Sequence, residues 1–142
     1  MIKAELAITR LLLYYVMKKV LISLSLGMLL LVACNGEKRE IKRVATAYLQ
    51  AMGDYQIADA APFATKETQD QTLKVVMEAV MPYVDTNYIN SNRPSKITIK
   101  SIEMVNDTEA VVLFHKSTPI TEVDGDLQMR KRLDGWRAHV LL

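Results

Sequence analysis

Several kinds of residue are scarce in this 142-residue chain, and their scarcity argues against some classes of functional site. It has one cysteine, two histidines, five glycines and four prolines. No glycine-rich phosphate loop is present, and no serine has a matching histidine and aspartate. His115 and His139 stand alone in predicted strands, so a metal site is not expected. We expect no metal and no cofactor.

Net charge is also low once the first 33 residues are set aside. The whole chain has a net charge of +2, but residues 1–33 hold four basic residues and only Glu5 as an acid. The remainder has 14 basic and 15 acidic residues, a net charge of −1. Nothing in this balance would draw the body of the protein to nucleic acid.

The apolar run of residues 20–33 is short for a membrane span. As a helix its fourteen residues would reach roughly 21 Å, against a hydrocarbon core of roughly 30 Å. "MKK" at 17–19 precedes it, and Ala33 and Cys34 end it. A positive start, a short apolar run and a small final residue are typical of a secretory signal peptide.

The end of this run, "LVAC" at 31–34, resembles the lipobox of bacterial lipoproteins. The resemblance implies cleavage between Ala33 and Cys34, and a lipid on the thiol of Cys34 that anchors the protein in the membrane. The enteric sorting rule that comes with this resemblance places a lipoprotein with asparagine after the cysteine in the outer membrane. We therefore predict a bacterial cell-envelope protein in the outer membrane. The alternative is an uncleaved anchor helix in which Cys34 is merely buried.

The chain then divides into four parts. Residues 1–16 do not fit a signal peptide, and we interpret them as an over-extended start before Met17. Residues 17–33 are the predicted signal peptide, 34–40 a charged tether, and 41–142 one folded domain. One long helix from Leu6 to Val32 is the alternative for the leader, although two lysines would then lie mid-span.

Helical periodicity marks the first half of the domain. An apolar stripe predicts a helix that Gly53 stops in the left-handed conformation, made by Ile41, Val44, Ala45, Tyr48, Leu49 and Met52. Asp54 would cap a second, short helix over 54–65. A third is expected over about 68–81, ended by Pro82. Residues 84–95 are polar and turn-rich, and predict a connection.

From Lys96 the apolar period becomes two, which predicts strands. A slip of phase between Ile99 and Ile102 indicates a bulge. "EAVVLFHK" at 109–116 is apolar on both faces and is expected to be a central strand. Leu127, Met129 and Leu133 are expected to face inward, and Asp134-Gly135 predicts a hairpin. The fold class is α+β: about three helices packed on a curved antiparallel sheet of about four strands.

Two segments resemble the nuclear-transport-factor-2-like, or cystatin-like, superfamily. They are "YLQAMGDYQIADAAPFATKET" (48–68) and "MRKRLDGWRAHVLL" (129–142). The resemblance implies a cone-shaped domain with a cavity, and it extends to small envelope lipoproteins. We expect the cavity to be lined by apolar and aromatic side chains, namely Tyr48, Met52, Met77, Met81, Met104 and Trp136.

The candidate function is non-catalytic binding of an apolar small ligand or an envelope protein partner. The alternative is a tethered isomerase or dehydratase, because the superfamily includes such enzymes. Its acid–base groups would come from Tyr48, Tyr55, Asp54, Asp59, His115 and His139. Each has a simpler interpretation, and no carboxylate has a defined acid–base partner. We therefore do not expect an enzyme.

Overall fold

The computed structural model describes the backbone of residues 2–142 and the side chains of residues 3–22 and 35–142. The chain forms two compact units, residues 1–37 and residues 38–142. The first unit belongs to helix α1 (Ile2–Gly53), which continues through residues 34–40, where a tether was expected. In the described residues, no helix is both long enough and apolar enough to cross a membrane.

Helix α1 supplies the first layer of the second unit. The predicted stripe is correct: Ile41, Val44 and Ala45 are fully buried, and Tyr48 is only 3% exposed. The helix ends at Gly53 as predicted, but the left-handed residue is Tyr55, with φ of 60°. Glycine is required at position 53 for a different reason: a Cβ there would collide with the side chain of Ser95.

A chain of short helical segments follows. They are α2 (Ile57–Ala60), η1 (Ala61–Phe63), α3 (Lys66–Thr68), η2 (Gln69–Leu73), η3 (Val76–Val80) and η4 (Met81–Tyr83). The Thr65 hydroxyl caps α3 by accepting from the amide of Thr68. The predicted third helix is thus present but irregular, since η2 and η3 are π-helical.

The expected connection contains a further helix, α4 (Thr86–Ser91), so that prediction was wrong. Its composition is polar and carries no apolar stripe. Local hydrogen bonds stabilise it instead. The Asp85 carboxylate accepts from the amide of Asn87 at 2.8 Å, and the side-chain amide of Asn92 donates to the carbonyl of Tyr88.

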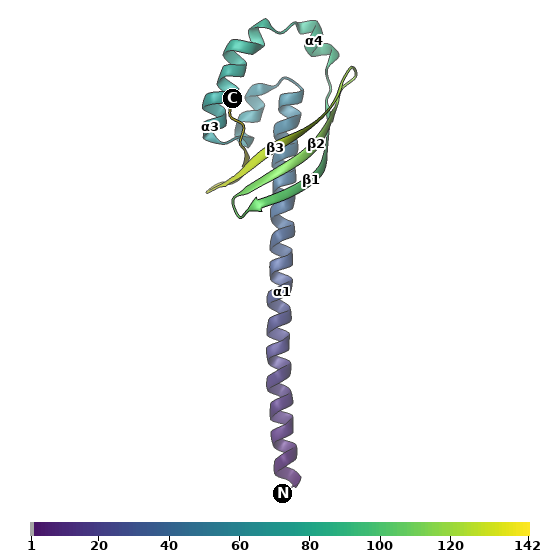
Figure 1. Ribbon diagram of the computed structural model, residues 1–142, viewed down its shortest axis with the longest axis vertical. Coiled ribbons are helices and arrows are strands. Elements are labelled where there is room, and N and C mark those ends of the chain that lie inside the picture. The colour runs from purple at the N-terminus through teal and green to yellow at the C-terminus, as the bar shows by residue number, and fades with distance from the viewer. Residues whose placement is uncertain (1) are drawn as a thin grey trace. The chain divides into compact units, whose positions relative to one another are not determined.

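The second layer is one antiparallel sheet in the order β1-β2-β3-β4 (Figure 1). Its strands are β1 (Lys96–Asn106), β2 (Glu109–Ser117), β3 (Glu122–Arg132) and β4 (Gly135–Ala138). The predicted bulge is confirmed by a register shift between Ile99 and Ser101. The β3–β4 hairpin is also confirmed, and Gly135 opens β4 with φ of 114°, a conformation that favours glycine.

One face of this sheet packs on the helices. We call it the inner face; it carries Ala110, Val112, Leu127, Met129 and Trp136, all buried. The opposite, outer face carries Val111, Gln128 and Arg130 among others. Leu133 was expected to face inward and does not: it lies in the hairpin turn and is fully exposed. The observed α+β architecture is the one that the sequence predicts.

Candidate functional site

The six residues predicted to line a cavity have different settings in the structure. Tyr48 and Trp136 lie in the core, and Met52 and Met81 pack against it. Met77 and Met104 are 42% and 37% exposed. Ala33 and Cys34, the predicted lipidation site, lie outside the residues whose side chains are described.

The space between α1 and the inner face is filled by side chains. A void large enough for water would leave accessible surface on the residues around it. Yet Val112 and Trp136 are 0% exposed, Met129 is 1% exposed and Leu127 is 3% exposed. Burial raises the pKa of the Tyr48 hydroxyl, which lies against the same core. This end of the domain is therefore a packed core.

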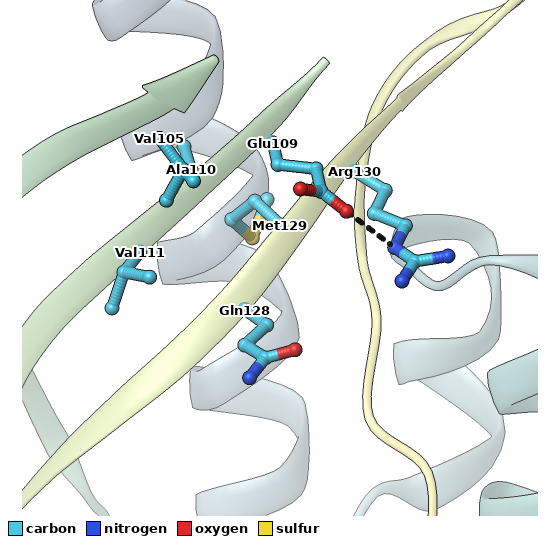
Figure 2. Close-up of a pocket in the computed structure, with 7 residues that line it drawn as sticks. All are labelled: Val105, Glu109, Ala110, Val111, Gln128, Met129 and Arg130. Carbon is cyan, nitrogen blue, oxygen red and sulfur yellow. Dashed lines mark ion pairs between the residues drawn. The ribbon is translucent and has the colours of Figure 1, made fainter.

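The outer face, by contrast, carries two adjoining hollows. The first, of about 190 Å³, is lined by Val105, Glu109, Val111, Gln128 and Arg130, and also by Ala110 and Met129, the strand neighbours whose buried side chains belong to the inner face (Figure 2). The second, of about 320 Å³, is lined by Asp126, Gln128, Arg130, His139, Val140 and Leu141. Gln128 and Arg130 belong to both. This pair of strand residues is therefore the centre of the candidate site.

The guanidinium of Arg130 has one ion-pair partner among the described residues, at its Nε. Its Nε lies 3.5 Å from Oε1 of Glu109, the residue opposite it on β2 (Figure 2). Glu109 is fixed in turn, because its Oε2 accepts from the side-chain amide of Asn106 at 3.0 Å. Among the described residues, no hydrogen bond engages the two terminal nitrogens of the guanidinium. They remain available to a ligand.

His139 forms the other side of the second hollow. It is 6% exposed, and its Nδ1 lies 2.9 Å from the hydroxyl of Thr65. Burial lowers the pKa of this histidine, and the positive charge of Arg130 lowers it further. The imidazole is therefore neutral at neutral pH.

Three threonines on one helical face hold the segment that carries His139. The amide of Val140 donates to Oγ1 of Thr68 at 2.9 Å, and the hydroxyl of Thr72 donates to the carbonyl of Val140. The amide of Thr65 also donates to the carbonyl of Ala138 at 2.8 Å. The C-terminal end of the chain consequently lies beside α3 (Figure 1).

The other groups considered for acid–base chemistry have structural partners or lie at the surface. Asp54 was expected to cap the second helix, but it does not cap α2. Its Oδ1 accepts instead from the amide and hydroxyl of Ser95. Partial burial would raise the pKa of Asp54, but hydrogen bonds from Gln50 and Ser95 outweigh it and lower the pKa. Tyr55 stacks edge-on against Tyr88, and Asp59 is exposed.

His115 has partners on the outer face as well. It lies 2.9 Å from Oδ1 of Asp124, and Lys100 reaches the same oxygen at 2.8 Å. These hydrogen bonds lower the pKa of the Asp124 carboxyl. Across the part of the chain described, no three histidine, cysteine, aspartate or glutamate side chains gather closely enough to hold a metal ion.

With the architecture known, the chain can be compared with known proteins. An NTF2-like protein of unknown function from Shewanella oneidensis is 19% identical, with a TM-score of 0.50 over 72% of this chain and 96% of its own. The chain has an NTF2-like fold. A ketosteroid isomerase-like protein from Erwinia carotovora atroseptica is also 19% identical, with a TM-score of 0.49 over 73% of this chain and 92% of its own. No protein-family model and no curated protein matches the chain.

The NTF2-like domain thus combines a filled core with a polar hollow on the outer face of its sheet. The sequence pointed to His139 as a candidate group but did not show which residues surround it. One signal was available: Thr65, Thr68 and Thr72 have the spacing of a single helical face. A row of buried threonines on a helix requires hydrogen-bond partners, which are here the backbone of residues 138–140 and the ring of His139.

Proposed function

We propose that the chain is a bacterial lipoprotein, anchored in the cell envelope through a lipid on Cys34, whose NTF2-like domain binds a ligand or partner without catalysis. The observation that carries the anchoring is the position of "LVAC" directly before a compact unit. That unit begins at Lys38, and its first fully buried residue is Ile41. Cleavage before Cys34 would remove none of the buried core of this unit. Two or more acyl chains on the new N-terminus would hold it stably at a membrane.

Packing of the domain supports binding over catalysis inside the cone. An isomerase or dehydratase needs room for its substrate beside an acid–base group. The inner face near Trp136 and Met129 leaves no such room. Binding at the outer face needs no interior cavity, because the hollows around Gln128 and Arg130 open directly on the surface of the sheet.

Metabolic labelling tests the anchoring. Bacteria expressing the full chain and supplied with radioactive palmitate should label the protein. Cys34→Ala should abolish the label and leave the precursor uncleaved, because the thiol that accepts the lipid is gone. Asn35→Ala is the matched control and should keep the label, since its thiol is intact. A Cys34→Ala chain that still matures and stays in the membrane would refute the proposal.

A further inference from the structure

The second hollow of the outer face has the chemistry of an anion site. Its walls bring together a guanidinium from β3, a side-chain amide from the same strand and an imidazole from the C-terminal segment, contributed by Arg130, Gln128 and His139. Arg130 is oriented by Glu109 through Nε. In Figure 2 its terminal nitrogens point away from Glu109. Beyond this ion pair, the guanidinium presents its two terminal nitrogens as parallel donors, the geometry that binds a carboxylate.

The hydrogen bonds behind His139 determine which ring nitrogen carries the proton. Oγ1 of Thr68 accepts from the amide of Val140 at 2.9 Å and lies 2.9 Å from Oγ1 of Thr65. If each hydroxyl passes its proton forward, Thr68 donates to Thr65 and Thr65 donates to Nδ1 of His139. The opposite direction would require Thr68 to donate to the carbonyl of Ala138 at 3.5 Å, which is a weak bond.

The short bonds therefore favour the tautomer with the proton on Nε2. Nδ1 faces Thr65 in the interior, and Nε2 lies across the ring from it. Among the described residues Nε2 has no hydrogen-bond partner. The ring thus offers the hollow a neutral N–H donor. The neutral state also agrees with the nearby charge of Arg130, which disfavours a second cation.

The remaining walls limit what the hollow can accept. Val140 and Leu141 offer apolar surface, and Asp126 places a carboxylate at the rim. Asp126 repels any anion, but it repels a dianion such as phosphate about twice as strongly as a monocarboxylate. A monocarboxylate can lie against Arg130 with its apolar part on Val140 and Leu141. A volume of about 320 Å³ is at the small end of the range for ligand sites.

We infer that this hollow binds a small monocarboxylate with an apolar tail, held by the terminal nitrogens of Arg130, the amide of Gln128 and Nε2–H of His139. The inference deepens the proposed binding role and rests on it. It assigns the ligand to the outer face of the sheet, away from the packed core around Trp136. The imidazole acts as a donor throughout and is not required to change its protonation.

Calorimetric titration of the purified full chain with isovalerate tests this site. We expect saturable binding with a Kd in the millimolar range, about what one oriented arginine with two weaker donors provides. Isovaleramide, which has the same shape and no charge, should not saturate over the same range. Inorganic phosphate should bind more weakly than isovalerate, because of Asp126.

Variants identify the residues. Arg130→Gln should weaken isovalerate binding about tenfold or more. Arg132→Gln is the matched control: it lies two residues along the same face, pairs with Glu67 at 2.8 Å and does not line this hollow. It should bind as the unmodified chain does. Gln128→Leu provides a second loss variant should Arg130→Gln fail to fold, as checked by circular dichroism.

The inference is wrong if isovalerate shows no saturable binding, if isovaleramide binds equally well, or if the loss variants bind like Arg132→Gln. These outcomes leave palmitate labelling of Cys34 untouched, so failure of the site and failure of the anchoring are read separately. Turnover of a carboxylate at this hollow would instead contradict the non-catalytic role.

Discussion

At the scale of single residues, His139 shows how burial makes an ordinary side chain sensitive to pH. The groups around it act in both directions: burial and the positive charges of Arg130 and Arg132 lower its pKa, and Glu67 and Glu109 raise it. The lowering effects are larger. The pKa in the folded state is therefore below the value of about 6.5 expected in the unfolded chain.

This shift predicts a loss of stability in mild acid. The unfolded chain binds a proton on His139 more readily than the folded chain does. The contribution of neutral His139 to the free energy of unfolding is therefore fully present above about pH 6.5, and it is lost as the pH falls through the folded-state pKa. Urea unfolding between about pH 7.5 and pH 5 should therefore show a falling free energy of unfolding. For His139→Gln, the free energy of unfolding should fall less steeply over the same pH range. Equal slopes for both chains would contradict the assignment.

At the scale of elements, the C-terminal segment is held by α3 and η2 rather than by the sheet alone. Thr68 is fully buried, and Thr68→Val would leave the amide of Val140 without its acceptor. We expect this change to cost about 1–3 kcal/mol of unfolding free energy. Unfolding can be followed by the fluorescence of Trp136, the single tryptophan in the chain.

A matched variant separates this effect from the general cost of replacing a helical threonine. Thr46 donates to the carbonyl of Lys42 on the exposed side of α1, so Thr46→Val removes a hydrogen bond that water can replace. Its effect should remain within about 0.5 kcal/mol. If Thr68→Val and Thr46→Val are equally mild, the threonine row does not hold the segment.

The elements also show which features a sequence can predict. The stripe of α1 and the alternation in β1 were found because burial repeats with the period of the element. Helix α4 was missed because an Asp85 cap and local polar bonds make it, without an apolar face. The predicted cap role of Asp54 was wrong, and the surroundings of His139 were not predicted, for another reason. Their partners, Ser95 and Thr65, lie 41 and 74 residues away in the sequence. A pattern within one segment does not contain such contacts.

At the scale of the whole molecule, the compact unit of residues 38–142 has a core that starts close to its first residue. Within this unit the first buried hydrophobic residue is Ile41, which is 0% exposed. Glu40 adds one contact, since its Oε1 accepts from the amide of Trp136 at 3.3 Å. The folded unit of residues 38–142 therefore requires residues from about 40 onward.

Two truncations that differ by four residues test this boundary. A chain beginning at Lys38 should unfold cooperatively, with a Tm within a few degrees of the full chain, because it keeps every buried residue among those whose side chains are described. A chain beginning at Lys42 lacks Glu40 and Ile41. Removing a fully buried isoleucine costs about 2–5 kcal/mol, which should lower Tm by about 10 °C or more. Thermal melts followed by circular dichroism would measure both. Equal melting of the two chains would show that the core does not depend on Ile41, and an unfolded Lys38 chain would show that the leader stabilises the domain.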